Sequence, residues 1–578
     1  MARYSLLSAA VAALTMSVGT LALGIPQSIA RTKMLPRASE VKAEYDYIVV
    51  GGGTSGLTVA DRLTESGERG MGGYRDPTLS FRFPSAPQVG LNGRSFGVVG
   101  GVMLGGSTGV NAMQLHRGQK EDYDRWGSYF GENSEWSWDG LLPYFKKAWN
   151  FHPPTTELAE KFDIKYDESF WGNTSGIHAS FPTFHWPMLK HEVAAFGEIE
   201  GVDFPPDSGA GEAGVFWYPL SSDPATVTRS MARKGHWDGI EAARDNYETI
   251  TGQRVLKVLF EGETAVGVSF VGANSTTVEG ARTVKAKKEI VIATGAIRTP
   301  QLLQRSGVGA KSLLQAAGID VVIDLPGVGH NFQDHPVGAG ATFTFTNFNV
   351  HPDMTDLENN QTFIDLARAE FEANRTDSFE QITTAYASQD PAAYLPAGTD
   401  ATVVAGYAVQ QKALAAAMRS KGAAFYNLFI RGAPTESNFV LLHPLSRGTI
   451  EIDTSDPFFK DPVVDYRALS NPADIDIQVE FIRFTRKYFL ETSLTEFAPV
   501  ETVPGANVTS FEGLSAAVRA QVSPTTFHPV GTAAMLPREL GPDLPGAYTQ
   551  QTVYAVAEKA ADLIKARAKG GCKAARKL

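Results

Sequence analysis

Three glycines near the N-terminus have the spacing of a loop that binds the phosphates of a dinucleotide. Gly51, Gly53 and Gly56 follow an apolar run at residues 48–50 and precede a helical pattern of apolar residues. The first glycine allows a tight turn, the second lets the backbone approach a pyrophosphate, and the third lets helix pack on strand. The helix N-terminus then offers unpaired N–H groups to the phosphates. These residues alone do not distinguish between three alternatives, which are a site for FAD, a site for NAD and a glycine turn that binds no ligand.

The elements around this loop are predicted from the pattern of apolar residues. Residues 248–260, 265–271 and 282–286 are expected to be three strands joined by turns that contain glycine or asparagine. Residues 289–293 form a short apolar run, typical of a buried strand, that ends in a second glycine turn at Gly295. A meander before a second strand-to-glycine turn indicates a dinucleotide-binding domain assembled from segments far apart in the chain.

The second half of the chain has a different pattern. Between residues 340 and 515, threonines at 342, 344 and 346 alternate with Phe343 and Phe345, and strand-like runs cover residues 439–442 and 449–452. We therefore expect a second domain with its own sheet and a helical cover. The chain should end in a helix that buries one apolar stripe, formed by Val553, Val556, Ala557, Ala560, Leu563 and Ile564.

Length and composition fit a folded protein of more than one domain. The chain has 578 residues, of which 43% are hydrophobic and 20% charged, and its formal net charge is −11. The negative charge argues against nucleic acid or an anionic membrane surface as a partner. Cys572 is the only cysteine, which excludes disulfides within the chain and cysteine metal clusters. We expect no metal site.

The N-terminus is typical of a secretory signal peptide. Arg3 precedes a modestly hydrophobic run over residues 6–24, and Ser28-Ile29-Ala30 offers a cleavage site. The alternative is a membrane anchor, because a run of this length could just span a bilayer. Its alanines, serines and glycines favour cleavage, so we expect secretion without stable membrane insertion. Five N-x-S/T sequons fit that route and predict glycosylation at Asn173, Asn274, Asn360, Asn374 and Asn507.

Four further stretches resemble signatures of the glucose–methanol–choline (GMC) oxidoreductases, which are FAD-dependent enzymes that oxidise alcohols. Residues 295–309 (GAIRTPQLLQRSGVG) are similar to the second signature of that family throughout. Residues 104–111 (LGGSTGVN) resemble its flavin-covering first signature, although Val102 stands where a basic or amide residue is usual. Residues 325–336 (LPGVGHNFQDHP) and 528–535 (HPVGTAAM) are similar to two more family motifs. The resemblance extends from about residue 45 to 568 and is closest to secreted fungal members.

The resemblance implies an α/β fold with two domains. A Rossmann-like FAD-binding domain, discontinuous in sequence, would be joined to a second α+β substrate domain built on an antiparallel sheet. After a signal peptide (1–30) and a linker (31–44), the FAD-binding domain would comprise residues 45–170, 226–339 and 516–568, the last part carrying the catalytic segment. The substrate domain would comprise residues 171–225 and 340–515, and residues 569–578 would form a basic tail.

The resemblance also implies roles for individual residues. Oxidising an alcohol removes a hydroxyl proton, which a neutral imidazole can take, and a hydride, which the flavin accepts. His528 is the candidate base, and Tyr548 occupies the position of a second catalytic histidine or asparagine, whereas His335 and His443 are interpreted as structural. The expected FAD contacts are Gly51, Gly53, Thr54, Ser55, Gly56, Ser107, Asn111, Ala112, Met113 and Gln114, with Val255 at the adenine.

Two pieces that the family carries have no clear counterpart. After Glu68 the family continues into a second buried strand that ends in a ribose-binding glutamate, but residues 69–75 read RGMGGYR, without an aliphatic run. After Gly541 we expect a hydrophobic strand and a flavin-contacting segment to be absent as well. Losing a strand with three buried aliphatic residues would cost roughly 5–9 kcal/mol, comparable with the net stability of a domain. A gene-model artefact and a true loss are both compatible with these gaps.

Three functions are compatible with this sequence. The first is a secreted FAD-dependent oxidase or dehydrogenase that converts a primary alcohol, aromatic or from secondary metabolism, to an aldehyde, with oxygen or a quinone as electron acceptor. The second is an impaired or inactive secreted glycoprotein of the same fold. The third is a lyase on the same scaffold, because the resemblance extends to cyanohydrin-cleaving family members.

Overall fold

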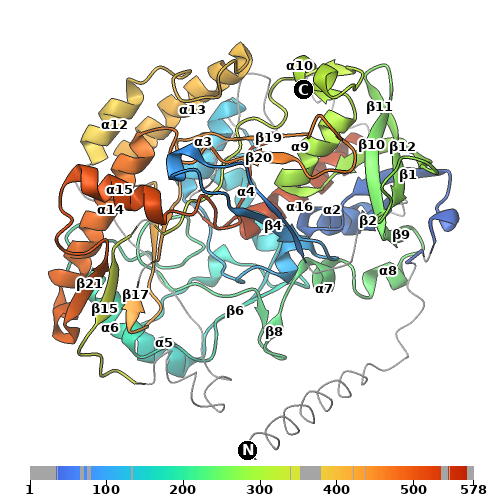
Figure 1. Ribbon diagram of the computed structural model, residues 1–578. Coiled ribbons are helices and arrows are strands. Elements are labelled where there is room, and N and C mark those ends of the chain that lie inside the picture. The colour runs from blue at the N-terminus through green and yellow to red at the C-terminus, as the bar shows by residue number, and fades with distance from the viewer. Residues whose placement is uncertain are drawn as a thin grey trace, which may run out of the picture.

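A computed structural model of the chain describes residues 34–35, 37–65, 70–74, 80–131, 134–338, 340–351, 379–420, 422–436, 438–534, 545 and 547–568. The chain forms two parts that share an extended border (Figure 1). One part is built on a six-stranded sheet near the N-terminus, and the other carries the long helices of the second half of the chain together with small antiparallel sheets (Figure 1).

The six-stranded sheet of the first part has the order β10-β11-β12-β1-β2-β9. Strand β1 (Glu44–Val50) pairs in parallel with β12 (Arg282–Ile292) and with β2 (Gly70–Tyr74), and β2 pairs in parallel with β9 (Tyr247–Thr251). Strands β10 (Gln253–Glu261) and β11 (Thr264–Gly272) complete the sheet as an antiparallel meander next to β12. Strand β1 is buried along most of its length because helices cover it, which explains its continuous apolar run.

Strand β2 corrects the expectation that the second strand is missing. Residues 70–74 pair with β1 on one side and with β9 on the other, so the sheet is continuous. Backbone hydrogen bonds need no particular side chain, and a glycine-rich segment can therefore fill a strand position that its composition does not predict. The cost calculated above for a lost central strand does not apply here.

The meander also differs from its predicted boundaries. The segment 248–260 is two strands, because Gly252 adopts a φ of +67° and turns the chain between β9 and β10. In the opposite sense, the runs 282–286 and 289–293 belong to one long strand, β12, whose end pairs with β1 up to Val50. The glycine turn after β12 leads into helix α9 (Gly295–Arg305), as the sequence predicts.

The closing helix α16 (Thr549–Ala568) is not the one-sided helix that its apolar residues predicted. Leu563 is exposed, whereas Gln551, Glu558 and Lys559 are buried. The helix packs between α2 (Thr54–Thr64) and α4 (Trp138–Lys147), so that two of its faces meet protein. The buried Glu558 accepts hydrogen bonds from Arg62 of α2 at 2.8–3.0 Å. These bonds compensate for burying a charged side chain, which the pattern of apolar residues along the helix did not predict.

The second part contains the antiparallel strands that the alternating pattern predicted. Strand β15 (Thr342–Phe345) lies between β17 (Thr435–Glu436) and β21 (Pro499–Val503), with Phe343 and Phe345 buried. A separate pair is formed by β16 (Tyr426–Phe429) and β18 (Asn438–Leu441). Helices α12 (Phe379–Ala387), α13 (Ala401–Arg419), α14 (Ala473–Leu490) and α15 (Phe511–Gln521) lie on the same side of the molecule (Figure 1). The division of the chain into the domains given above stays a prediction.

The remaining elements are mostly short. They include α3 (Lys120–Tyr129), α6 (Met188–Phe196), and the pairs β3 (Ser80–Pro84) with β4 (Gly97–Gly101) and β19 (Thr449–Glu451) with β20 (Val463–Asp465). The others are η1 (Ala38–Glu40), η2 (Val89–Leu91), η3 (Gly106–Gly109), β5 (Asn150–His152), α5 (Thr156–Phe162), η4 (Glu168–Phe170), β6 (His178–Ser180), β7 (Ser222–Asp223), β8 (Thr228–Arg229), α7 (Ala232–His236), α8 (Ile240–Ala243), β13 (Val308–Gly309), α10 (Lys311–Ala316), β14 (Ile323–Asp324) and η6 (Ser493–Phe497).

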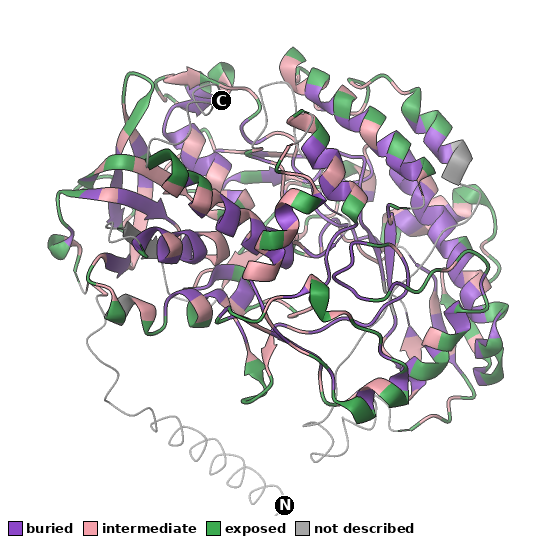
Figure 2. Cartoon of the chain, turned by 180° about the vertical axis from the view of Figure 1, so that it is seen from behind, coloured by how far each residue is buried: buried purple, intermediate pink, exposed green. Residues whose placement is uncertain are grey.

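Buried residues fill both parts and the border between them, and exposed residues follow the outer helices and turns (Figure 2). Of the predicted glycosylation sites, Asn173, Asn274 and Asn507 are exposed, and Asn360 and Asn374 lie outside the described residues. The predicted signal peptide and basic tail with Cys572 also lie outside them. Across the described ranges, no helix is long and apolar enough to cross a membrane. No three His, Cys, Asp or Glu side chains in those ranges are grouped to hold a metal ion.

Candidate active site

The glycine turn between β1 and α2 has the geometry of a phosphate-binding loop. Gly51 adopts a φ of +115°, and a Cβ on it would lie 2.3 Å from the Ala293 carbonyl oxygen. A Cβ on Gly56 would lie 1.9 Å from the carbonyl oxygen of Gly51, so the helix packs on the turn through a glycine. Helix α2 begins at Thr54 without a side-chain cap from Gly53, which leaves its first N–H groups for an anion.

The flavin-covering loop predicted from residues 104–111 lies directly against this turn. The Gly105 N–H donates to the carbonyl oxygen of Gly52 at 2.9 Å, and a Cβ on Gly106 would lie 2.8 Å from the Gly53 Cα. The backbone of Ser107, an exposed residue, accepts from Asn111 N at 3.0 Å. The two glycine-rich segments, about fifty residues apart in sequence, therefore form one continuous backbone surface.

Asn111 connects that loop to the start of α16. Its side-chain amide donates to Gln550 Oε1 at 2.7 Å, while its Oδ1 accepts from Arg229 at 2.6 Å and from the Met113 backbone at 3.2 Å. Ala112 is exposed, and Gln114 donates to the Tyr218 hydroxyl at 3.1 Å. Asn111 thus links the flavin-covering loop to the start of α16, and the flavin contacts of residues 111–114 stay a prediction.

The adenosine end is less completely described. Val255 lies half-buried on β10 and packs against the sheet cluster that includes Val50 and Ile250, so only part of its side chain faces outward. The family's ribose carboxylate was expected to be absent after β2. The sequence contains Asp76, which follows the end of β2 by two residues and Gly56 by the twenty that such a carboxylate typically shows. Asp76 lies outside the described residues. Its spacing from Gly56 nevertheless shows that the predicted absence of an acidic residue at this point of the sequence was wrong.

His528 lies in a cluster of aromatic and imidazole rings. Its Nδ1 lies 3.0 Å from Nδ1 of His335 and 2.9 Å from the Thr526 hydroxyl. The ring of Tyr548 is centred 4.8 Å from the His528 ring and 4.6 Å from the ring of His116. Residues from four distant segments therefore meet at one place, and the two predicted catalytic side chains, His528 and Tyr548, are neighbours.

Burial keeps the three imidazoles of this cluster neutral. Burial lowers the pKa of His528 and, together with the nearby His528, that of His116, in each case to about 3. The pKa of His335 is also held well below its ordinary value, first by burial and then by the two neighbouring imidazoles of His528 and His443. A neutral imidazole has a lone pair on one ring nitrogen, which is the form that can accept a proton at neutral pH.

The carboxyl group of Asp334 holds the His528 loop in place. Its Oδ1 accepts from the backbone N–H of His528 at 3.0 Å and of His335 at 2.8 Å, and its Oδ2 accepts from the Thr525 hydroxyl at 2.5 Å. Burial raises the pKa of Asp334 to about 7 despite these hydrogen bonds. Phe527 adopts a φ of +67°, a strained conformation that the flanking hydrogen bonds of this loop maintain.

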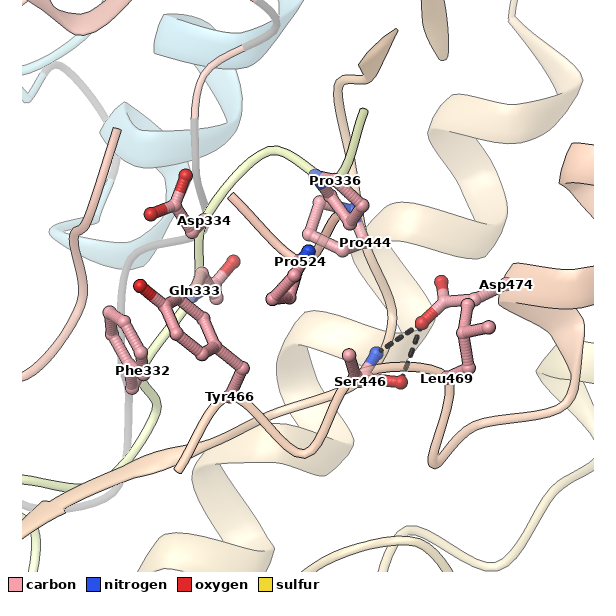
Figure 3. A pocket seen from close by; sticks show the side chains of 11 residues that line it. Phe332, Gln333, Asp334, Pro336, Pro444, Ser446, Tyr466, Leu469, Asp474 and Pro524 are labelled. Atoms are coloured by element: carbon pink, nitrogen blue, oxygen red, sulfur yellow. Dashed lines mark hydrogen bonds between the residues drawn. The ribbon is translucent and has the colours of Figure 1, made fainter. Parts of the chain in front are cut away.

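A small cavity lies behind this loop, on the side of Asp334 (Figure 3). Its volume is about 20 Å³, and Asp334 and Tyr466 line one side while Ser446 and Asp474 line another (Figure 3). Asp474 accepts from the Ser446 N–H at 2.9 Å and from its hydroxyl at 2.6 Å. A space of this size has room for a water molecule but not for an alcohol substrate, so this cavity is not a substrate site.

The sequence predicts His528 and Tyr548 as site residues, and the structure makes them neighbours, but the residues that support them were missed. His335 was interpreted as structural, yet its ring contacts His528 directly. The available signal was its place in the motif 325–336, which lies beside the motif around His528 in the fold. His116 gave no signal, because a single histidine outside any recognised motif is usually a structural residue. His443 keeps its structural interpretation, with its Nε2 3.2 Å from Asp122 Oδ1 and its ring packed on Phe425.

The chain belongs to the GMC oxidoreductase family. Residues 45–337 match the N-terminal domain of that family and residues 444–541 match its C-terminal domain. The fold and the glycine turn, the second signature at α9 and the His528 segment all agree with this assignment. The chain is therefore an oxidoreductase with FAD as its cofactor.

Individual relatives extend over nearly the whole chain. It is 35% identical to the dehydrogenase xptC of Emericella nidulans, over 93% of this chain and 96% of that one. Among solved structures it is similar to an FAD-dependent oxidoreductase of Chaetomium thermophilum, at 32% identity and a TM-score of 0.84, covering 91% and 100% of the two chains. It is also similar to a fungal aryl-alcohol oxidase, at 31% identity and a TM-score of 0.83, covering 92% and 100%.

The alignment with the Emericella relative also bears on the expected missing pieces. It spans 611 positions, which is more than the 578 residues of this chain. That relative therefore has residues without a counterpart here, and their place in the chain stays a prediction. The structure fills the strand position after α2 with β2, while residues 535–544 lie outside the described residues.

The residues of this chain fit FAD at the observed places. The uncapped start of α2 and the glycine cradle would hold the pyrophosphate, and residues 111–114 would border the flavin. At the start of α16, the side-chain Nε2 atoms of Gln550 and Gln551 are buried and have no hydrogen-bond partner in the part of the chain that the structure describes. Such donors suit the carbonyl oxygens of a flavin ring.

Proposed function

We propose that this protein oxidises a primary alcohol, aromatic or from secondary metabolism, to the aldehyde, with His528 as the base. The observation that carries the proposal is the neutral His528 imidazole, held at Nδ1 by Thr526 and His335 beside the Tyr548 ring. With Nδ1 occupied, Nε2 is the ring nitrogen that would take the hydroxyl proton of the substrate. Bound FAD supplies the hydride acceptor.

Aromatic side chains near His528 support an aromatic substrate. Tyr548, Phe216 and Tyr218 surround the His116 ring, and the neighbouring Phe527 exposes 58% of its surface. Planar rings offer such a substrate stacking contacts and exclude water from the reacting carbon. The name of the aryl-alcohol oxidase relative agrees with this class of substrate. Tyr548 would donate a hydrogen bond to the substrate oxygen, because a phenol with a pKa near ~10 stays protonated at neutral pH.

The proposal extends to the surroundings in which the protein works. The N-terminal sequence and the exposure of Asn173, Asn274 and Asn507 support a secreted glycoprotein. Oxygen or a quinone would reoxidise the flavin, and anaerobic reduction followed by mixing with each acceptor distinguishes them. Treatment of the protein secreted by its host with an N-glycosidase would lower its apparent mass if these sites are glycosylated.

The test replaces His528 by alanine and follows flavin absorbance under anaerobic conditions with 4-methoxybenzyl alcohol. We expect flavin reduction to slow by about 10²–10⁴, the contribution of a positioned base, while bound FAD remains. His191→Ala is the control, because this histidine lies at the surface and its neighbours are Glu496 and Phe497 rather than the rings around His528. Equal reduction rates in the His528 variant and the parent would overturn the assigned role. A flavin that stays oxidised in the parent with every alcohol offered would favour the inactive or lyase alternative.

A further inference from the structure

We propose that Thr526 is a positioning residue that fixes the proton of His528 on Nδ1 and so leaves the lone pair on Nε2. This inference rests on the proposed function of His528 as the base. A neutral imidazole exists in two forms, and only the form with an unprotonated Nε2 can take a proton through that atom. The residue that selects the form therefore decides whether His528 is competent before the substrate arrives.

The direction of the hydrogen bonds around Thr526 selects the form. The Thr526 hydroxyl lies 3.2 Å from the carbonyl oxygen of His335 and 2.9 Å from Nδ1 of His528. A carbonyl oxygen only accepts, so the single hydroxyl proton is used there. The hydroxyl oxygen then has lone pairs facing Nδ1 of His528, and that contact is a hydrogen bond only if Nδ1 carries the proton.

His335 agrees with the same arrangement. Its Nδ1 lies 3.0 Å from Nδ1 of His528, and two ring nitrogens at that distance share one proton. The backbone carbonyls of Leu442 and Pro545 act on the His335 ring as well. Because these carbonyls can only accept, they favour a proton on Nε2 of His335, although that atom has no partner within hydrogen-bond geometry among the described residues, and Nδ1 of His335 would then accept from His528.

The backbone of the loop keeps Thr526 in this geometry. Asp334 accepts from the N–H groups of both histidines, and the Thr525 hydroxyl donates to Asp334 while accepting from the Phe527 N–H at 2.7 Å. Thr526 thus lies between Thr525 and His528, and both of these residues donate hydrogen bonds to Asp334. The Thr526 hydroxyl contacts Nδ1 of His528, and the proposed reaction takes place at the other ring nitrogen.

The experiment compares Thr526→Val, which removes the hydroxyl but keeps the shape, with Thr526→Ser, which restores it. Thr485→Val is the matched control, because the Thr485 hydroxyl donates to the Phe481 carbonyl within α14, remote from the histidines. Nitrogen-15 NMR of the histidine rings reports which nitrogen carries the proton, and it can be recorded on the FAD-loaded protein without substrate. The His528→Asn variant identifies the His528 signals among the 11 histidines.

We expect the parent and Thr526→Ser proteins to show His528 protonated at Nδ1, and Thr526→Val to show a mixture of both forms. Flavin reduction by the aromatic alcohol should slow roughly tenfold in Thr526→Val, the effect of ~1.4 kcal/mol on a barrier, with unchanged substrate affinity. Serine should recover most of the rate. A parent protein protonated at Nε2, or a Thr526→Val protein that keeps the Nδ1 form and the full rate, would overturn the inference. If no alcohol is oxidised but the Nδ1 form depends on Thr526, the proposed function fails and the hydrogen-bond assignment stands.

Discussion

At the scale of single residues, burial sets the chemistry of this site. His116 and His335 are fully enclosed and His528 is largely enclosed, so each of the three rings loses the hydration that would stabilise its charged form. Loss of hydration has the opposite effect on the pKa of Asp334, because the charged form of a carboxyl group is the deprotonated one. Its pKa is raised to about 7. The three imidazoles are therefore neutral at neutral pH, whereas Asp334 is close to its midpoint of ionisation.

Tyr548 provides a prediction at this scale. Its phenol should orient the substrate oxygen without exchanging a proton, so Tyr548→Phe should lower kcat/KM roughly threefold to tenfold, the value of one neutral hydrogen bond. Steady-state rates at several pH values measure this, and the profile below pH ~9 should keep its shape. A fall beyond about a thousandfold, or a changed profile in that range, would show that the phenol acts as an acid or base.

At the scale of elements, the dinucleotide site depends on how closely one helix can approach one turn. The N-terminus of α2 would reach the phosphates of FAD only because Gly56 packs on Gly51, and the flavin-covering loop lies against α2 only because Gly106 packs on Gly53. These approaches join two separate chain segments at backbone level. Side-chain chemistry contributes little to them, which explains why the glycine spacing is such a strong signal in the sequence.

Gly56→Ala should therefore disrupt FAD binding. Its Cβ would lie 1.9 Å from the Gly51 carbonyl oxygen, and a backbone atom cannot move away without opening the turn. We expect FAD affinity, measured by fluorescence titration, to fall more than tenfold and the melting temperature to drop by several degrees. Gly272→Ala is the matched control, since a Cβ there meets nothing within 4 Å. Comparable FAD affinity in the two variants would contradict this account of the turn.

At the scale of the whole molecule, the two parts are joined by elements that contact both. Segment 325–336 follows the dinucleotide-binding part and precedes β15, and it supplies the histidine and aspartate that hold the His528 loop. Helix α16 lies in the last thirty residues of the chain, packs on α2 and follows directly after Tyr548. The candidate site therefore forms only when both parts are folded.

Acid stability gives a prediction at this scale. The pKa of buried His116 is about 3 in the folded protein against 6.5 when unfolded, so between those values the unfolded state binds one more proton than the folded state. Stability is then complete above pH ~6.5 and falls as the pH drops. In His116→Phe, the free energy of unfolding should depend less on pH between about 3.5 and 5.5, by roughly 1.4 kcal/mol per pH unit. Urea unfolding at a series of pH values measures this slope, and an unchanged slope would show that His116 is charged when folded.

The sequence alone determined the parts of this protein that rest on local backbone geometry and on motif. Gly51, Gly53 and Gly56 predicted the first turn, and the alternation around Phe343 predicted β15. The motif at residues 528–535 identified the family. These features depend on residues close together in the chain, where spacing translates directly into structure.

Only the tertiary structure decided the rest, because it depended on partners distant in sequence. A glycine-rich segment became strand β2 through the backbone of its neighbours β1 and β9, which no property of residues 70–74 reveals. Helix α16 buries charged residues because α2 supplies Arg62 opposite Glu558. His335 gained its place beside His528 only when two segments almost two hundred residues apart packed together, since side-chain contacts of that kind are set by folding and not by spacing.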